Sequence, residues 1–261
     1  EVQGNEVQGN EVQGNEVQGN EVHRAGNGVH GIEDSGMEND DIIVNPPAFV
    51  EILDSIPSPY TDVMMSLLNN KIVYFETSRG CPFSCSYCLS SATEGTRFFS
   101  LERVFSDLDR LAEAGVKQIK FVDRTFNSHK RRAIEIIRHI IELNKQINLN
   151  LGASSSFDFD RICPASGNNQ NRCDNIVCNF HFEVGADLFD EETIQLLESA
   201  PKGLFQIEAG VQSTNNEALE AVNRKTNLDK LFRNLIRLKK SGNIHIHADL
   251  IAGLPHEGYD S

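Results

Sequence analysis

Three cysteines lie close together in the sequence, at Cys81, Cys85 and Cys88, directly after the pair Arg79-Gly80. Three and then two residues separate them, so one short glycine-led loop can turn three thiolates toward one point. Three thiolates suit an iron–sulfur cluster in which one iron has no protein ligand. Structural zinc prefers four ligands in two separated pairs, so it fits a compact triplet less well. The segment therefore predicts a metal site with an open coordination position.

The spacing of these cysteines resembles the signature of the radical SAM superfamily. The resemblance implies that the three cysteines hold a 4Fe-4S cluster and that S-adenosyl-L-methionine (SAM) chelates the fourth iron. It also implies that Tyr87, the aromatic residue before the third cysteine, lies beside the adenine. Enzymes of this family cleave SAM reductively to a 5′-deoxyadenosyl radical that abstracts hydrogen from a substrate. An electron donor such as flavodoxin or ferredoxin is then an implied partner.

Composition and charge narrow the class of protein. The chain has 261 residues, of which 39% are hydrophobic, enough for one medium domain with appendages. A net charge of −14 argues against general nucleic-acid or anionic-membrane binding and favours a small-molecule or protein substrate. The sequence has no long apolar segment and no signal-peptide pattern, so we expect a soluble, cytoplasmic protein whose six cysteines are ligands or free thiols.

The N-terminal part differs in composition from the rest. Residues 1–22 are four copies of Glu-Val-Gln-Gly-Asn and the start of a fifth, a low-complexity repeat that we expect to be a disordered tail. A repeat-based interaction tail is the alternative. Residues 23–70 are a polar tail and a proline-rich connector, expected to lie extended across a surface. This connector resembles the one that follows a cobalamin-binding domain in one branch of the superfamily, so cobalamin is expected only with a domain that is missing here.

Residues 71–261 are expected to form the core, because strands and helices alternate along them. We predict helices after Ser100, over 128–144, after Asp190 and over 227–241, and strands over 117–122, 180–184, 204–208 and 244–251. Repeated β-α units of this size predict an α/β fold with parallel strands and helices outside. The resemblance implies a partial (β/α)6 radical SAM barrel, truncated after its fifth strand.

A loop insertion interrupts this pattern over residues 150–179. It contains Cys163, Cys173 and Cys178, which could ligate an auxiliary cluster. Their spacings match no pattern typical of cluster ligands, so we interpret them as incidental thiols and leave them out of the site.

Polar residues recur at every second position of three predicted strands. His181 and Glu183 alternate with phenylalanines, and the later strands carry Gln206 and Glu208, and then His245, His247 and Asp249. Side chains of a strand alternate between its two faces, and a barrel used only as a core would be filled with Val, Ile and Leu. The pattern therefore predicts a wet, ligand-holding cavity, with functional groups at the carboxyl ends of the strands.

The resemblance extends to strand ends outside the cysteine loop. The run Gln206–Ser213 looks like the glycine-glutamine-serine strand end of the coproporphyrinogen-dehydrogenase-like and elongator-like branch, which implies that Gln212, with Ser213 beside it, contacts the cofactor ribose. Twelve residues after Gln212, Arg224 matches the family arginine that pairs with the methionine carboxylate. Alone, this arginine would more often be a solvated helix charge.

Two carboxylates match the same branch. The run Asp249–Pro255 resembles its aspartate-leucine-isoleucine-x-glycine-leucine-proline strand, and Glu183 matches a glutamate on an earlier strand. The resemblance implies that both reach the ribose or other polar cofactor atoms. Lone charges on apolar strands are costly to bury, which favours a functional role over a structural one.

The second predicted strand departs from the common family pattern. Where the family has a glycine-glycine pair, this chain has Phe121–Asn127, similar to an aspartate-containing variant. The resemblance implies that Asp123 and Asn127 are further cofactor contacts. We interpret the chain as a radical SAM enzyme acting on an unknown substrate. The alternatives are a cobalamin-dependent radical SAM methyltransferase, and an inactive truncated fragment or metal-stabilised binding module.

Overall fold

A computed structural model describes residues 50–92, 95–153 and 178–258. The predicted repeat over residues 1–22, residues 23–49 of the predicted tail, and Cys163 and Cys173 lie outside the described residues.

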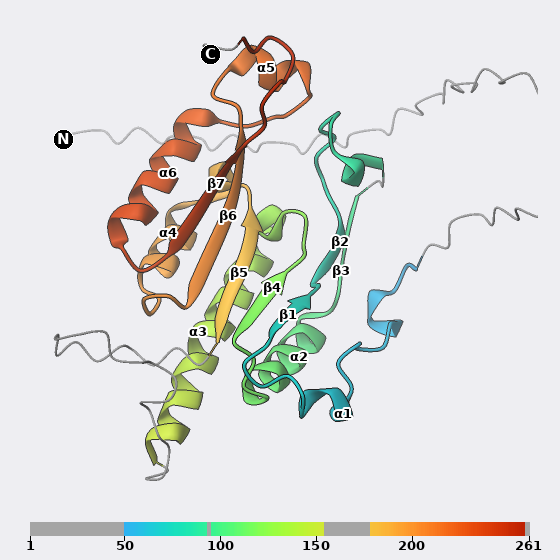
Figure 1. The fold of residues 1–261 in the computed structure, drawn as a ribbon, viewed down its shortest axis with the longest axis vertical. Coiled ribbons are helices and arrows are strands. Elements are labelled where there is room, and N and C mark those ends of the chain that lie inside the picture. Colours follow the sequence, from blue (N-terminus) through green and yellow to red (C-terminus); the bar gives the residue numbers. More distant parts are fainter. Residues whose placement is uncertain (1–49, 93–94, 154–177, 259–261) are drawn as a thin grey trace, which may run out of the picture. The chain divides into compact units, whose positions relative to one another are not determined.

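A parallel sheet of five strands organises the molecule (Figure 1). Its strands follow one another in space as they do along the chain, and every neighbouring pair is parallel: β1 (Ile72–Phe75), β4 (Gln118–Phe121), β5 (Asn179–Val184), β6 (Phe205–Gln212) and β7 (His245–Leu250). The predicted α/β fold with a partial barrel is confirmed. Because all five strands run the same way, their carboxyl ends meet at one edge of the sheet.

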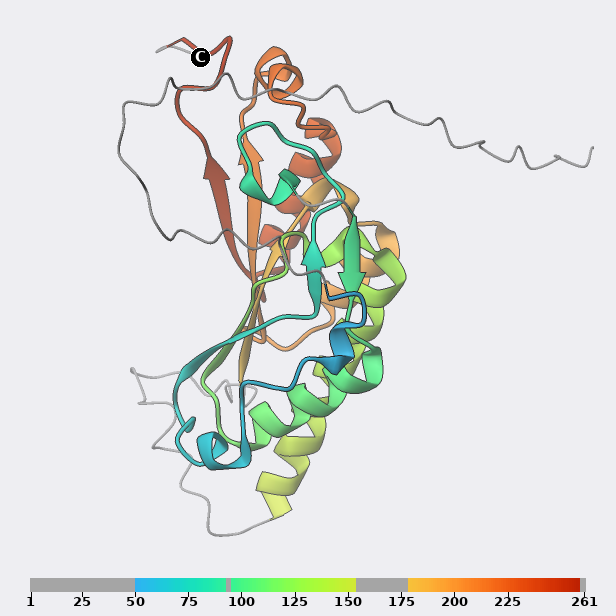
Figure 2. The ribbon, with the colours of Figure 1, turned by 90° about the vertical axis from the view of Figure 1, so that its right-hand side faces the viewer.

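Four helices pack on one face of this sheet, as Figures 1 and 2 show: α2 (Leu101–Glu113), α3 (Lys130–Ala153), α4 (Glu191–Glu198) and α6 (Leu228–Ser241). Side chains of Ser100, Asp190 and Asn227 cap the first turns of α2, α4 and α6, each accepting from the backbone N–H three residues on. Gly242, with φ at 71°, ends α6 in the left-handed conformation. These are the boundaries that the sequence predicted.

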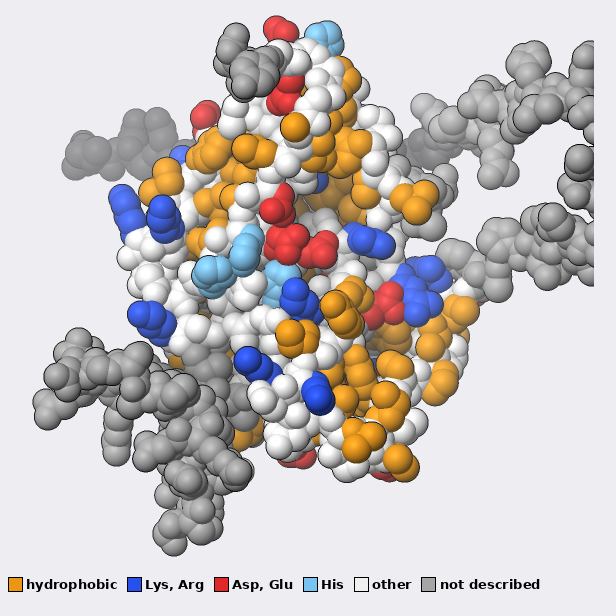
Figure 3. Space-filling view, viewed as in Figure 1, with side chains coloured by type: hydrophobic (Ala, Val, Ile, Leu, Met, Phe, Trp, Pro, Cys, Tyr) orange, Lys and Arg blue, Asp and Glu red, His pale blue; other side chains and the backbone are white. Residues whose placement is uncertain are grey.

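The two faces of the sheet differ in polarity. Phe180 and Phe182 of β5 are 2% and 1% exposed and pack in the core beneath the helices. The alternate residues His181 and Glu183 lie on the opposite face, as the alternation predicted. Acidic and histidine side chains gather over the strands on the face seen in Figure 3. The sheet therefore carries its polar groups on the side that the helices leave uncovered.

Several short elements were not predicted. An antiparallel hairpin, β2 (Ser78–Gly80) and β3 (Thr96–Phe98), flanks the cysteine loop. The short helices α1 (Asp62–Met65) and α5 (Asn216–Ala221) lie where no helix was predicted. Single turns of 3₁₀ helix cover Leu53–Ser55, Leu89–Ala92, Phe126–Ser128 and Ala186–Leu188. Elements of this length bury too little apolar surface to leave a periodic pattern.

Two elements are longer than predicted. Helix α3 continues to Ala153, into the predicted insertion, because no glycine or proline interrupts the sequence before Gly152. Strand β6 continues to Gln212, because Ala209 and Val211 extend its alternation of buried residues past Glu208.

The described part of the proline-rich connector packs on the domain, but it is not extended throughout, because it contains a 3₁₀ turn and α1. Leu53 is 2% exposed and belongs to the core. The hydroxyl of Tyr60 donates to the carbonyl of Tyr74 at 2.5 Å and accepts from its N–H at 3.0 Å. Tyr60 thus occupies the outer edge of β1. None of the helices in the described residues is long and apolar enough to cross a membrane.

Candidate SAM and iron–sulfur site

The cysteine loop follows β2 at the carboxyl end of β1. Gly80, the residue before Cys81, has φ at 96°, and a Cβ atom there would lie 2.1 Å from the carbonyl oxygen of Gly95. Only glycine fits this position, because it must adopt a left-handed conformation against the backbone of the returning chain. The two strands of the hairpin thus fix the place where the loop begins.

Asp123 binds the segment that leads into the cysteine loop. Its carboxylate is 0% exposed and accepts from the N–H of Thr77 (2.8 Å), the hydroxyl of Thr77 (2.5 Å) and the N–H of Ser78 (2.7 Å). Burial raises the pKa of Asp123, against the lowering effect of these hydrogen bonds. The sequence suggested a cofactor contact for Asp123. Its contacts in the structure are instead with the segment that leads into the cysteine loop.

All three cysteines of the triplet lie on this loop. Cys85 is buried, Cys81 and Cys88 are partly exposed, and the N–H of Cys88 donates to the carbonyl of Cys85 at 3.1 Å. The sulfur of Cys81 lies 3.8 Å from the hydroxyl oxygen of Thr125, and that of Cys85 lies 4.0 Å from Nη1 of Arg224. In the described residues, no three His, Cys, Asp or Glu side chains are placed to hold one metal ion. A 4Fe-4S cluster makes a different demand, because each cysteine binds a different iron.

Tyr87 lies beside these thiols. It is 39% exposed, and partial burial, together with the nearby Cys85 and Cys88, raises the pKa of Tyr87 to about 12. The phenol is therefore neutral at physiological pH. Its expected contact with adenine stays a prediction.

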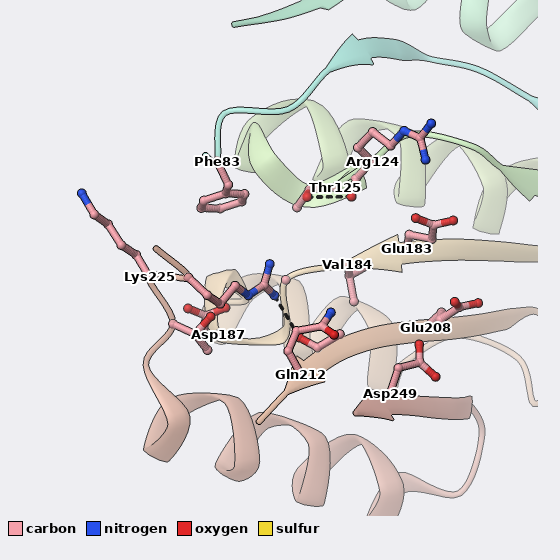
Figure 4. A pocket seen from close by; sticks show the side chains of 14 residues that line it. Phe83, Arg124, Thr125, Glu183, Val184, Asp187, Glu208, Gln212, Lys225 and Asp249 are labelled. Atoms are coloured by element: carbon pink, nitrogen blue, oxygen red, sulfur yellow. Dashed lines mark hydrogen bonds between the residues drawn. The ribbon is translucent and has the colours of Figure 1, made fainter. Parts of the chain in front are cut away.

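A cavity opens next to the cysteine loop at the carboxyl ends of β5, β6 and β7 (Figure 4). It encloses about 130 Å³, less than the roughly 300–1,000 Å³ of typical small-molecule sites. Its wall includes four of the predicted cofactor contacts: Glu183, Gln212, Arg224 and Asp249. Phe83 brings the cysteine loop to the same wall. Residues from motifs more than a hundred positions apart therefore meet at one cavity.

Gln212 and Arg224 take their positions from Gly210. A bulge in β6 lies between Gly210 and Gln212, and Gln212 has φ at 69°. A Cβ atom at Gly210 would lie 2.1 Å from Nε2 of Gln212. Arg224 donates from Nη2 to the carbonyl of Gly210 at 2.9 Å, while its Nε is buried with no hydrogen-bond partner among the described residues. Within the described residues, the guanidinium thus keeps a buried donor that could bind a further acceptor.

Three carboxylates lie together at the other end of the cavity, on adjacent strands (Figure 4). Glu183 pairs in register with Glu208, and Asp249 pairs with Gly210. Burial, and then the charge of Glu208, raise the pKa of Glu183. Oε2 of Glu208 lies 3.2 Å from Nε2 of His181. Like charges placed opposite each other are unfavourable, so this end of the cavity favours a ligand that donates hydrogen bonds.

Two further predicted contacts, like Tyr87 and Asp123, lie outside the cavity wall. Ser213 is 2% exposed, donates from its hydroxyl to Glu257, and accepts from the N–H of Asn215 at 2.9 Å. Asn127 is buried and pairs with the backbone of Gly185, accepting from its N–H at 2.9 Å and donating to its carbonyl at 2.8 Å. Both side chains join neighbouring segments of the rim, which is a supporting role.

The structure also adds wall residues that the sequence did not assign to the site: Phe83, Arg124, Asp187, Glu208 and Lys225. Alternation along β6 placed Glu208 on the polar face, but no motif marked it as a site residue. Phe83, Arg124 and Asp187 follow strand ends and Lys225 follows α5, and no motif marked any of these four residues as part of the site.

The donor groups at this site fit the cofactors that the sequence implied. Three cysteines lie on one loop, and the guanidinium of Arg224, whose buried Nε has no partner among the described residues, lies near one of them. An amide and carboxylates line the cavity beyond. Thiolates suit iron, a guanidinium suits a carboxylate, and amide and carboxylate oxygens suit ribose hydroxyls.

Comparison with known proteins supports the same interpretation. The family model described as the radical SAM superfamily matches residues 75–261. This range begins at the end of β1 and includes the cysteine loop and the whole cavity wall.

The similar curated proteins include methyltransferases. An uncharacterised methyltransferase of Pyrococcus horikoshii is 38% identical over 130 residues, covering 47% of this chain and 28% of that protein. The cobalamin-dependent radical SAM methyltransferase TokK of Streptomyces tokunonensis is 30% identical over 186 residues, covering 70% of this chain and 23% of TokK. The chain thus spans about a quarter of the length of these relatives.

Solved structures share the fold. The cobalamin-dependent SAM radical enzyme OxsB, with aqua-cobalamin and SAM bound, matches with a TM-score of 0.53 at 19% identity, covering 82% of this chain and 28% of OxsB. The radical SAM methyltransferase TsrM of Kitasatospora setae, with cobalamin and a [4Fe-4S] cluster bound, matches with a TM-score of 0.52 at 20% identity, covering 71% of this chain and 30% of TsrM. At this identity the likeness shows the fold alone.

Proposed function

Because this chain belongs to the radical SAM superfamily, we propose that it contributes the cluster- and SAM-binding core of an enzyme that cleaves SAM reductively. Cys81, Cys85 and Cys88 would hold a 4Fe-4S cluster as thiolates. When bound, the cluster and SAM supply a one-electron reductive cleavage of SAM that starts hydrogen abstraction from the substrate.

The side chains of the cavity bind and orient SAM in this proposal. Arg224 pairs its planar guanidinium with the methionine carboxylate, using the buried Nε that has no partner among the described residues. Gln212, Glu183 and Asp249 accept hydrogen bonds from the ribose or donate to it. Burial, and then the charge of Glu208, raise the pKa of Glu183.

One observation carries the proposal: residues from five separate segments meet at one edge of the sheet. Phe83 of the cysteine loop, Glu183, Gln212, Arg224 and Asp249 line one cavity. A structural zinc loop on an ordinary packed barrel has no need of such a cavity beside it.

Anaerobic reconstitution tests this proposal. The purified chain should bind about four iron atoms, as one 4Fe-4S cluster requires, and should release methionine and 5′-deoxyadenosine from SAM under a strong reductant. The matched control is the variant with Cys81, Cys85 and Cys88 all replaced by alanine, which should bind no cluster. Stoichiometric zinc binding without SAM cleavage would support a metal-stabilised binding module instead.

Methyl transfer assisted by cobalamin is the second candidate. Both similar curated proteins described above are named methyltransferases, and one is named cobalamin-dependent. A corrinoid absorption spectrum of the full-length protein, with transfer of a deuterated methyl group from SAM to substrate, would support it. A protein that cleaves SAM but binds no corrinoid would exclude it. The substrate, and an electron donor such as flavodoxin or ferredoxin, are further proposals.

A further inference from the structure

The cysteine loop contacts a second segment of the chain, which follows α5. The N–H of Ser86 donates to the carbonyl of Val222 at 2.9 Å. The side-chain amide of Asn223 donates to both the carbonyl (3.0 Å) and the hydroxyl (2.7 Å) of Ser84. The two bonds between Asn223 and Ser84 join residues 139 positions apart in the sequence. The loop is thus held at its tip as well as at its base.

This segment is itself fixed to the sheet. Val222 is 4% exposed and packs with Ala218 of α5 and with Leu254, which follows β7. Asn215 caps α5 and donates from its side-chain amide to the carbonyl of His256 at 3.0 Å. Residues 222–224 are therefore held in place by contacts with α5 and with the segment after β7, and the cysteine loop binds to them.

The backbone at Asn223 explains how its amide reaches the loop. The N–H of Asn223 donates to the carbonyl of Glu220 at 3.0 Å, and the N–H of Arg224 donates to that of Leu219 at 2.8 Å. With φ at 54° for Asn223, these two bonds form a Schellman motif that ends α5. Glycine is the usual residue at this position, because it has no Cβ. Asparagine also tolerates the conformation and adds an amide, which here points at Ser84.

The next residue is Arg224, which contacts the same loop. Its guanidinium carbon lies 6.0 Å from the centre of the Phe83 ring, and its Nη1 lies 4.0 Å from the sulfur of Cys85. Two consecutive residues therefore contact the cysteine loop: Asn223 binds it through hydrogen bonds, and Arg224 places its guanidinium beside it.

We propose that Asn223 is a positioning residue that fixes the cysteine loop relative to Arg224, and so sets the distance between the open coordination position of the cluster and the group that holds the methionine carboxylate. This inference rests on the proposed function. In the proposed function, SAM would chelate the metal and pair with Arg224 through the same end of the molecule, so a loop that moves relative to Arg224 could not satisfy both contacts at once.

The variant Asn223→Gly tests this role. Glycine keeps the left-handed end of α5 and removes only the amide, so the chain should fold as before. The matched control is Asn70→Gly, which changes another exposed asparagine with positive φ (59°), located just before β1 at the opposite edge of the sheet. The parent and both variants are compared after each has been fully loaded with the cluster.

We expect Asn223→Gly to keep its iron content and to bind SAM about tenfold more weakly, the effect of losing two neutral hydrogen bonds. The KM for SAM should rise while kcat at saturating SAM changes little. Without the cluster, hydrogen exchange of the backbone amides over residues 84–87 should be faster than in the parent and in Asn70→Gly.

Three results would overturn the inference. One is a SAM affinity equal in Asn223→Gly, Asn70→Gly and the parent, which would refute it and leave the proposed function intact. Another is loss of iron from Asn223→Gly with an unchanged affinity for SAM in the loaded fraction, which would assign the residue to cluster assembly. Failure of the parent itself to bind SAM would overturn the proposed function and this inference together.

Discussion

At the scale of single residues, buried polar groups around the cysteine loop fall into two classes. Asp123, Asn127 and Ser213 have their hydrogen-bonding atoms occupied by other parts of the chain. Arg224 keeps a buried donor without a partner among the described residues. A satisfied buried group supports structure, whereas an unsatisfied one facing a cavity indicates a ligand.

Two replacements of Asp123 test its structural role. Asp123→Ala leaves the N–H groups of Thr77 and Ser78 and the Thr77 hydroxyl without a buried partner, so the free energy of unfolding should fall by about 3 kcal/mol. Asp123→Asn offers an amide oxygen to both N–H groups and an amide N–H to the hydroxyl, so it should recover most of that loss. Urea unfolding of the two variants measures the difference. Equal losses in both would show that the negative charge itself is required.

The difference between the two classes could not be predicted from the sequence. The partners of Asp123 lie 45 and 46 positions earlier, and Glu257 lies 44 positions after Ser213. A motif shows which residue types occur at a given spacing, but it does not identify hydrogen-bond partners that are distant in the sequence. The cysteine triplet was predictable because its chemistry lies within eight residues, from Cys81 to Cys88.

At the scale of elements, the end of β6 places two cofactor contacts at once. The absent side chain of Gly210 leaves room for the amide of Gln212, and its carbonyl accepts from Arg224. The sequence predicted β6 to end at Glu208 and therefore missed the bulge that turns Gln212 into the cavity. The alternation along the strand was visible, but the register shift depends on pairing with β7.

Gly210→Ala tests this arrangement. The new Cβ would overlap Nε2 of Gln212, which is the free end of a flexible side chain, so stability should change by less than about 1 kcal/mol. The amide must leave its position, so SAM binding should weaken about as much as in Gln212→Ala. A double-mutant cycle with titrations of SAM measures this, and the two changes should not be additive. Full additivity would show that Gly210 acts by another route.

Helix α4 offers a test by pH. Burial opposes ionisation of Asp190, but hydrogen bonds from Lys130 and Thr193 outweigh it and lower the pKa of Asp190 to about 2, from 3.8. The folded state therefore favours the ionised form, and the resulting stability is present above pH 3.8 and is lost as the pH falls toward 2. Asp190→Asn keeps the helix cap and removes the charge.

We expect the parent to be slightly more stable than Asp190→Asn at neutral pH, because the pair with Lys130 is largely solvent-exposed. The difference should vanish near pH 2. Asp190→Ala should lose a further 1 kcal/mol or so at every pH, through loss of the cap. Urea unfolding between pH 2 and pH 7 measures all three proteins. A constant difference between the parent and Asp190→Asn across this range would contradict the assigned pKa.

At the scale of the whole molecule, the sequence predicted the parallel α/β sheet and the polar face of that sheet, because both depend on local periodicity. It did not predict that the cysteine loop is held at two points, by Asp123 at its base and by Asn223 at its tip. These contacts exist only once strands and loops distant in the sequence meet at one rim. The contacts that hold the loop therefore depend on the tertiary structure and not on local sequence.

The central claim is that three thiolates leave one metal position open for SAM at this rim. Electron–nuclear double resonance on the anaerobically reconstituted, reduced protein tests it directly, with SAM carrying ¹⁷O in its carboxylate or ¹⁵N in its amino group. We predict hyperfine coupling of both labels to the cluster in the parent, and loss of the carboxylate coupling in Arg224→Ala. A parent protein that binds SAM with no coupling from either label would contradict the account.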